Sequence, residues 1–391
     1  SIPSIFNPVD TPPPSASELV AIPGLNPMIP LWWGLIGFIV ALVIHEFGHG
    51  LLARGHGMRI RSFGLLQLGP LPLGAFAEPQ AEELFKAPRK ERQRMFAAGP
   101  ATNLFAAFAI LLLLGGLAAQ FSTTDESIHV RGIVKDQPAD LAGMEPWDVI
   151  ATINGTEVVG LDGFRALMSE HKAGDNVTLG VIHNDGVSEN LTILLGDKYE
   201  HYLSEGFSKS DLELLEVEPG DAFLGVEGMA QNTAGIDRIA GPLSPNKDYT
   251  LLQRSLLTPF HVLQVMILPF ESQGVAMAPA EEAMLETDDG LMSSLLGKEG
   301  LLFLVNLLFW VMWVNILLGF TNLIPMVPFD GGHMFKDMVH AGLTRFRAVG
   351  RKLKLWNFHP MWIDHWSRKA SSISSLLILF ALLFTIFIPY F

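Results

Sequence analysis

Three residues whose side chains can bind a metal ion or transfer a proton occur together in the run His45-Glu46-Phe47-Gly48-His49. On an α-helix, positions i and i+4 share a face, so both imidazoles can converge on one ion with Glu46 beside them. Two histidines and a carboxylate form a common catalytic zinc set, which leaves the fourth position for water. Zinc lowers the pKa of that water to about 7, and an adjacent glutamate can pass its proton to a leaving amine. The pattern predicts Zn²⁺ as the cofactor, His45 and His49 as ligands, and Glu46 as the catalytic base.

The motif lies in an apolar stretch, residues 31–53, that is long enough to cross a bilayer. HExxH also occurs by chance in soluble helices, but charged residues in the hydrocarbon zone cost about 2.5–3.5 kcal/mol each on insertion scales. Ligation of one shared metal ion explains why three polar groups occur in this apolar helix. Because the chain has no cysteine, every other ligand must be His, Asp, Glu or water.

A third ligand is expected from another span at the same depth, and Asp330 is the best candidate. It belongs to the run Asn-Leu-Ile-Pro-Met-Val-Pro-Phe-Asp-Gly-Gly that starts at residue 322, in which two prolines break the helix. Irregular backbone at membrane depth is tolerated only where protein or a water cavity surrounds it, so such a break is typical of a site. The alternative is a loop aspartate that faces the cytosol. His56 and His333 are rival ligands, ranked lower because their Gly-rich surroundings indicate loops.

The elements that must position these residues are apolar helices. Of the 391 residues, 49% are hydrophobic and only 17% are charged, which argues against a wholly soluble protein. We predict a polytopic α-helical membrane protein with about four transmembrane helices. The predicted membrane segments are 31–53, 95–120, 300–335 (a span followed by the Asp330 segment) and 373–391, while 255–270 is short, broken by Pro259, and predicted to be interfacial or re-entrant.

Charge predicts how these spans are oriented, because cytoplasmic loops near span ends carry an excess of Lys and Arg. Residues 54–94 hold eight basic residues against four acids, and residues 321–372 hold eight against three, whereas residues 121–299 hold ten against thirty. Segment 54–94 and the basic loop 336–372 are therefore predicted to be cytoplasmic, and 1–30 and the acidic insert extracytoplasmic. The alternative is that the insert is merely acidic and soluble, which leaves its side undecided. A net charge of −14 makes nucleic-acid binding improbable.

The insert begins with a predicted α+β domain at residues 125–195, in which short alternating strands are separated by turn signals. Helices are expected at 138–143 and 162–171. The run from 132 to 158 resembles a PDZ domain, although Trp147 stands where that family usually has glycine. PDZ grooves accept an extended peptide as an added strand; the alternative is a small β-rich domain without a ligand. Residues 196–299 are acidic and functionally unassigned, and 280–290 are expected to form a solvated linker.

Taken in order, these motifs resemble the site-2 protease family of intramembrane metalloproteases, in its four-span, PDZ-containing branch. The resemblance rests on HEFGH in the first span, Gly-Pro-x-x-Asn ending at Asn103 in the second, the PDZ-like domain, and the segment from Asn322 to Asp330. It implies that His45, His49 and Asp330 hold zinc and that Glu46 is the general base. Asn103 and Asn322 would position the substrate backbone or stabilise the oxyanion; helix packing is the alternative.

Loop 61–79 is apolar and rich in Gly and Pro, and it resembles the re-entrant β-hairpin of the same family. A peptide bond inside a transmembrane helix is shielded by its own hydrogen bonds, so cleavage requires local unwinding. An exposed strand edge can pair with the unwound segment and replace the lost bonds. The alternative is a plain buried β-turn loop.

The sequence therefore favours a zinc endopeptidase of the cell membrane that cuts the transmembrane segments of single-span membrane proteins near the cytoplasmic end. The alternative is a PDZ-bearing membrane adaptor with a structural or inactive metal site, which the presence of Glu46 disfavours. A transporter is disfavoured by the single HExxH motif and the absence of inverted repeats. The sequence does not indicate the substrate, the oligomeric state, or whether a segment precedes Ser1.

Overall fold

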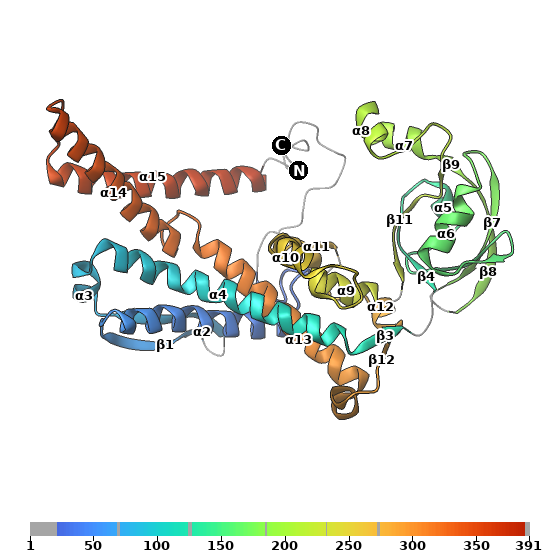
Figure 1. Cartoon of the computed structure of the whole chain (residues 1–391), viewed down its shortest axis with the longest axis horizontal. Helices are drawn as coiled ribbons and strands as arrows, with labels where there is room; N and C mark the ends of the chain where they lie inside the picture. Colours follow the sequence, from blue (N-terminus) through green and yellow to red (C-terminus); the bar gives the residue numbers. More distant parts are fainter. Residues whose placement is uncertain are drawn as a thin grey trace. The chain divides into compact units, whose positions relative to one another are not determined.

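The computed structural model describes residues 22–68, 71–123, 127–183, 186–231, 233–271 and 274–387, with the backbone alone for 63, 65–68, 71–79, 81, 85, 271, 386 and 387. The chain divides into two compact units (Figure 1). The helical unit comprises Ser1–Gly115, Tyr249–Ala276 and Phe303–Phe391, and the sheet unit comprises Gly116–Asp248 and Met277–Leu302.

Four helices are long and apolar enough to cross a membrane, which confirms the number of spans predicted from the sequence. They are α2 (Leu31–Gly55), α4 (Arg89–Ala118), α13 (Leu291–Asn322, interrupted at Gly297) and α15 (Pro360–Phe387). The helices α4, α13 and α15 begin earlier than the predicted spans, because hydropathy marks only the apolar part of a helix. Residues 388–391 of the predicted last span lie outside the described residues.

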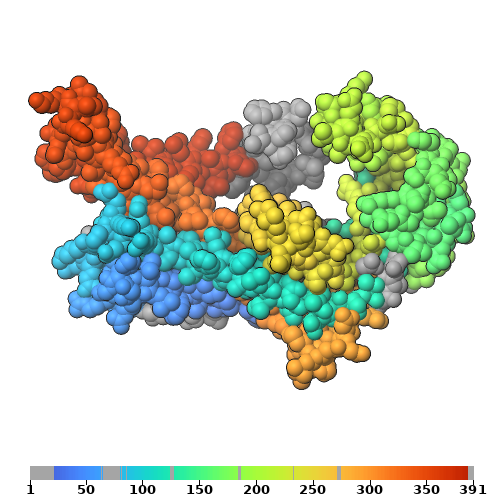
Figure 2. All heavy atoms as spheres, in the orientation of Figure 1, coloured from blue at the N-terminus to red at the C-terminus, as the bar shows by residue number. Residues whose placement is uncertain are grey.

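Small residues allow α2, α4 and α13 to approach one another closely. A Cβ at Gly37 of α2 would meet the backbone of Trp310 in α13, and one at Gly319 of α13 would meet Leu104 in α4. Trp310 and Phe309 are fully buried. The α2 and α4 segments lie side by side in both whole-chain views (Figure 1; Figure 2). The result is a tight three-helix contact around the motif-bearing helix.

The segment after α2 folds back as an antiparallel hairpin of β1 (Ile60–Leu68) and β2 (Leu71–Pro79). Strand β2 runs beside α2. A β-hairpin is therefore confirmed for loop 61–79, while its insertion into a membrane stays a prediction. The short helix α3 (Ala81–Lys86) leads from the hairpin to α4.

Two other parts of the helical unit are more regular than the sequence indicated. The predicted basic loop 336–372 is mostly helical: α14 (Asp330–Leu353) packs against α15, and Lys354 ends α14 in a left-handed conformation. The many Lys and Arg residues of this segment were used to predict its side of the membrane, but they are also good helix formers. The predicted short segment 255–270 forms α10 (Leu251–Val265) and α11 (Leu268–Glu271), and α10 continues through Pro259.

The core of the sheet unit is a six-stranded antiparallel sheet with the strand order β11-β4-β5-β7-β8 and β6 paired to β5. Its inward-facing residues, such as Ile128, Ile150 and Leu179, are fully buried. The strands are β4 (Ile128–Ile133), β5 (Val149–Ile153), β6 (Thr156–Glu157), β7 (Asn176–Ile182), β8 (Ser188–Leu194) and β11 (Val226–Gln231), with helices α5 (Pro138–Leu141) and α6 (Gly160–Ser169). The predicted α+β domain is thus confirmed, with Trp147 at φ 76° where glycine was expected.

The predicted end of this domain at residue 195 is wrong, because β11 pairs with β4 and completes the sheet. Strand β11 carries Gly228 and several polar residues, so it lacks the alternation that reveals a strand in the sequence. The other elements of the unit are β3 (Phe121–Thr123), β9 (Gly196–Asp197), α7 (Lys198–Ser204), α8 (Lys209–Leu214), β10 (Ala222–Phe223), α9 (Ala234–Ala240), a 3₁₀ turn (Gly241–Leu243), α12 (Pro279–Ala283) and β12 (Leu285–Thr287).

The expected solvated linker at 280–290 is also wrong. Glu281 of α12 is 1% exposed and receives two hydrogen bonds from Arg238, at 2.6 and 2.7 Å. The following strand β12 pairs with β3. The acidic residues of this segment suggested exposure to solvent, but Glu281 is held by Arg238, which lies 43 residues earlier in the chain.

Candidate metal centre

Three predicted ligands meet at one point in the helical unit. His45 and His49 project from α2, and Asp330 is the first residue of α14. The two histidine Nε2 atoms are 3.1 Å apart, and Asp330 Oδ2 lies 3.2 Å from that of His45 and 3.1 Å from that of His49. Among the described residues, these three form the candidate metal-binding cluster, and His45 is almost completely buried.

The other imidazole nitrogens are held by groups that fix which ring nitrogen carries the proton. His49 Nδ1 lies 2.8 Å from the carbonyl oxygen of Met95, which can only accept, so Nδ1 is the donor. His45 Nδ1 lies 2.9 Å from Asn103 Oδ1. The Asn103 amide nitrogen donates to the Ala41 carbonyl and to Asn315 Oδ1, both at 3.0 Å, which leaves Asn103 Oδ1 as the acceptor for His45.

Both Nε2 atoms therefore present lone pairs to each other and to the Asp330 carboxylate. Three such acceptors within 3.2 Å repel unless a cation or shared protons lie between them. Three donors about 2.0 Å from one tetrahedral zinc ion would be about 3.3 Å apart, close to the observed separations. Histidines that bind zinc usually donate their other ring N–H to an oxygen atom, as the Nδ1–H groups of His45 and His49 do here. The described residues thus fit zinc.

Close backbone approach around the cluster depends on two glycines. A Cβ at Gly99 of α4 would overlap both imidazole rings, and a Cβ at Gly331 would overlap the Leu323 and Ile324 carbonyls. Because Gly331 has no side chain, the start of α14 can lie directly against the carbonyl groups of the turns that follow α13. The predicted helix break before Asp330 is confirmed, and it consists of turns over 323–329.

A cavity of about 290 Å³ opens at the cluster. Glu46 lines it beside the ligands, and so does Asn322, whose amide nitrogen donates to the Leu318 carbonyl at 3.0 Å. Asn103 is fully buried and its described hydrogen bonds go to protein groups, so in this structure it orients His45. Its direct contact with a substrate stays an untested prediction.

The rival ligands lie apart from the cluster. His56 follows the end of α2, and His333 stacks on Phe96 with ring centroids 4.9 Å apart. Sequence reasoning missed Asn315, whose carboxamide supports Asn103 from α13, and the Met95 carbonyl. A backbone acceptor leaves no signal in the residue types, and the Asn315 contact spans 212 positions.

Known proteins are similar in sequence to much of this chain. The chain is 23% identical over 335 residues to the uncharacterized protein MJ0971 of Methanocaldococcus jannaschii, which covers 84% of this chain and 64% of that protein, so the chain spans less than two thirds of this relative. It is 22% identical over 363 residues to the zinc metalloprotease Rip1 of Mycolicibacterium smegmatis, which covers 76% of this chain and 82% of that protein.

Among solved structures, a PDZ domain of an SdrC-like protein from Listeria monocytogenes is 20% identical and covers 26% of this chain and 87% of that chain, with a TM-score of 0.20. A likeness at that TM-score does not establish a fold. The family comparison extends much further, because residues 33–359 match the sequence model of Peptidase family M50 and include all three predicted ligands and Glu46. The chain belongs to Peptidase family M50.

Proposed function

We propose that this chain is a zinc-dependent intramembrane endopeptidase that cuts the transmembrane segments of membrane-anchored proteins. The observation that carries the proposal is that His45 and His49, on a helix apolar enough to span a membrane, converge with Asp330 of α14 within 3.2 Å. Glu46 lines the same cavity. Membership of family M50 supports the reaction class, and a relative named as a zinc metalloprotease supports the metal.

The residues divide the chemistry between holding an ion and moving a proton. The His45 and His49 Nε2 atoms and the Asp330 carboxylate would hold zinc, which supplies a Lewis acid that polarises a carbonyl and acidifies water. The Glu46 carboxylate takes the proton from the attacking water and delivers it to the leaving amide nitrogen. The Asn103 and Met95 oxygens keep both imidazoles neutral and correctly turned throughout.

Access of the substrate is the role we propose for the β1–β2 hairpin. A transmembrane helix must unwind locally before its peptide bond can reach the cavity, and each unmade hydrogen bond is costly in hydrocarbon. Only two strands form this hairpin, so each has an edge that is not used by the other strand. An unwound substrate that pairs along such an edge would recover its hydrogen bonds. We propose two partners for this chain: single-span membrane proteins as its substrates, and the lipid bilayer that surrounds it.

The orientation that we propose places the metal centre toward the cytoplasmic side and the sheet domain outside. The support is the charge pattern: basic residues dominate 54–94 and 321–372, and acids dominate 121–299. Four apolar helices are consistent with a multi-pass membrane protein.

The experiment compares purified wild type with Glu46→Gln on a panel of single-span substrates, with and without a chelator. Glu46→Gln should keep about one zinc per chain and lose cleavage, because the ligands remain and the base is gone. Glu82→Gln is the matched control, since Glu82 is exposed on α3 and outside the cavity. Cleavage by Glu46→Gln at the wild-type rate, or wild type purified without chelators and free of zinc, would contradict the proposal.

A further inference from the structure

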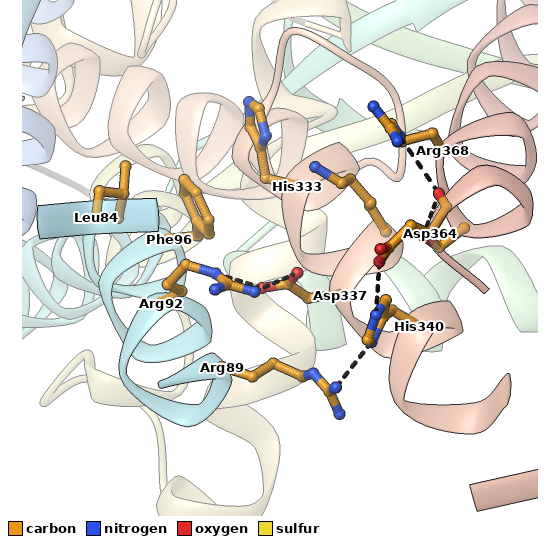
Figure 3. A pocket seen from close by; sticks show the side chains of 11 residues that line it. Leu84, Arg89, Arg92, Phe96, His333, Asp337, His340, Asp364 and Arg368 are labelled. Atoms are coloured by element: carbon orange, nitrogen blue, oxygen red, sulfur yellow. Dashed lines mark hydrogen bonds and ion pairs between the residues drawn. The ribbon is translucent and has the colours of Figure 1, made fainter. Parts of the chain in front are cut away.

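A second cavity, of about 620 Å³, lies among the N-terminal part of α4, helix α14 and the N-terminal part of α15 (Figure 3). It shares the lining residues Leu84 and Phe96 with the metal centre, and the ring of His333 stacks on Phe96 between them. Its walls are strongly charged. Four full cations line it against two carboxylates: Arg89, Arg92, Lys336 and Arg368 against Asp337 and Asp364.

Both carboxylates are already occupied by groups of the protein. Arg92 makes two hydrogen bonds to Asp337, from Nε at 3.1 Å and from Nη2 at 2.9 Å, and also donates to the Ala87 carbonyl. Asp337 is 7% exposed, so this pair is a largely buried, neutral unit. Figure 3 shows the two side chains facing each other. Neither Arg92 nor Asp337 leaves a net charge for a ligand.

A chain of hydrogen bonds links Asp364 of α15 to residues of α14 and α4. Arg89 Nη2 lies 2.8 Å from His340 Nδ1, and His340 Nε2 lies 2.9 Å from Asp364 Oδ1. Arginine can only donate, so His340 accepts at Nδ1 and donates from Nε2. In this arrangement the one N–H group of the His340 ring, at Nε2, donates to Asp364 (Figure 3).

Three cationic side chains still have donors to spare. The Lys336 ammonium makes no hydrogen bond or ion pair with any described residue, and Arg368 uses only Nε, at 3.4 Å from the Asp364 carbonyl. Arg89 uses one of its five N–H groups on His340. One of these three comes from each of α4, α14 and α15. The cavity thus has a surplus of positive charge and of hydrogen-bond donors.

We propose that this cavity binds a phosphate group. The oxygen atoms around a phosphorus atom are arranged tetrahedrally, so they accept hydrogen bonds from donors in different directions, whereas the two oxygens of a carboxylate lie in one plane. Donors on three separate helices match the former. The cavity lies where two candidate membrane helices begin, with Leu84 and Phe96 on its wall, which suits the headgroup of an anionic phospholipid. A soluble phosphate compound has the same chemistry. This inference is independent of the proposed peptidase activity.

The experiment titrates the full chain, purified in a non-ionic detergent, with dihexanoyl phosphatidylglycerol and separately with inorganic phosphate, using calorimetry. Lys336→Gln should weaken binding at least about tenfold, as expected for one lost charge-assisted hydrogen bond, and Lys336→Arg should largely retain it. Lys90→Gln is the matched control, because Lys90 is exposed on α4, makes the same change in net charge and lies outside the cavity. Arg368→Gln provides a second, independent loss of affinity.

The two ligands distinguish the sources of the phosphate. Tight binding of the lipid alone assigns a headgroup site, and equal binding of inorganic phosphate assigns a site for soluble phosphates; both support the proposal. The proposal fails if neither phosphate binds, if Lys90→Gln weakens binding as much as Lys336→Gln, or if a triglutamate peptide binds as tightly as the phosphates. Lys336 makes no hydrogen bond or ion pair with a described residue, so its replacement should not unfold the protein, and circular dichroism checks this.

Discussion

Residues of the candidate metal centre owe their geometry to neighbours that are not among the predicted ligands. The positions of His45 and His49 followed from helical spacing alone, and the choice of Asp330 followed from the helix break that precedes it. The hydrogen-bond partners that orient the imidazole rings could not be predicted from the sequence, because Asn103 and Asn315 meet only when three helices pack together. Residue types and local spacing therefore predict which side chains are ligands, while packing decides how they are held.

Gly99 offers a sharp test of that packing. Gly99→Ala should abolish or strongly reduce zinc binding, because the new methyl group would occupy the space of both imidazoles. Gly116→Ala is the control on the same helix: nothing lies near its Cβ, so it should leave zinc binding unchanged and stabilise α4 by about 0.5–1 kcal/mol. Zinc per chain is measured after gel filtration. Full zinc occupancy in Gly99→Ala would show that the two helices are farther apart than this structure has them.

Elements that carry no ligand still support the site. Ser374 of α15 donates to the Pro325 carbonyl at 2.8 Å, and Ser375 accepts from the Val327 N–H at 3.0 Å. These contacts hold the non-helical turns that precede Asp330. Hydropathy predicted α15 as a membrane span and gave it no further role, because small hydroxyl residues in an apolar helix do not reveal what they face. Their partners are nearly 50 residues away in the chain.

The double substitution Ser374→Ala and Ser375→Ala should loosen those turns and weaken zinc affinity. Each lost hydrogen bond contributes about 1 kcal/mol, so a loss of zinc affinity of about fivefold for each is expected if both act only in the zinc-competent state. Affinity is measured by competition with a calibrated chelator. Ser372→Ala removes a hydroxyl bonded only within α15, to the Arg368 carbonyl, and should have no effect. Equal affinities for the double variant and wild type would deny α15 this role.

Glu281 is expected to make the stability of the sheet unit depend on pH in the acidic range. Burial by itself raises the pKa of Glu281, but the Arg238 hydrogen bonds and charge, with the Ala278 N–H, lower it below the ordinary 4.5. A carboxyl whose folded pKa is depressed stabilises the fold above its unfolded pKa, and this contribution is lost as pH falls through the folded value. The stability of the α9–α12 region should therefore be constant above about pH 5 and fall below 4.5.

Glu281→Gln should remove that dependence and destabilise the region near neutral pH by about 3 kcal/mol, because Arg238 is left buried without its charge partner. Hydrogen exchange of peptides from α9 and α12 measures both effects. Glu213→Gln, at an exposed position, is the control. An identical acid profile in wild type and Glu281→Gln would show that another group titrates.

The whole molecule combines a helical unit that contains every described residue of the metal-centre cavity with a sheet domain that contributes none of them. Composition and the order of motifs predicted this division, since the apolar spans and the acidic insert differ in both hydropathy and charge. The boundary of the sheet domain was not predictable, because β11 joins an edge strand nearly 100 residues earlier. That boundary decides how the domain can be removed.

Residues 128–231 can be deleted as one piece. Ile128 and Gln231 are direct partners across β4 and β11, so the cut ends are adjacent and a short Gly/Ser bridge joins them. The buried cluster formed by residues such as Ile150, Val177 and Leu224 lies entirely inside the deleted segment. The deletion leaves the Arg238–Glu281 pair in place. It removes Arg131, whose Nε lies 3.9 Å from Glu281 Oε1, and the contacts of α9 with β11.

We predict that this sheet domain filters substrates and takes no part in bond breaking. The charge pattern predicts that the domain lies outside and that the candidate metal centre lies toward the cytoplasmic side. On that prediction, much of a hydrocarbon core of about 30 Å would separate them. A bulky substrate ectodomain would then meet the domain before its transmembrane segment reached the cavity. Deleting 128–231 should leave zinc content and cleavage of a pre-trimmed substrate unchanged, and cleavage of the untrimmed substrate should rise. Both substrates are assayed side by side with Glu46→Gln in the deleted background as the blank. If the deletion abolishes cutting of the trimmed substrate while zinc content and helicity persist, the domain is a required docking element for the substrate, because only the loss of a productive contact, and not the removal of an obstacle, would produce that result.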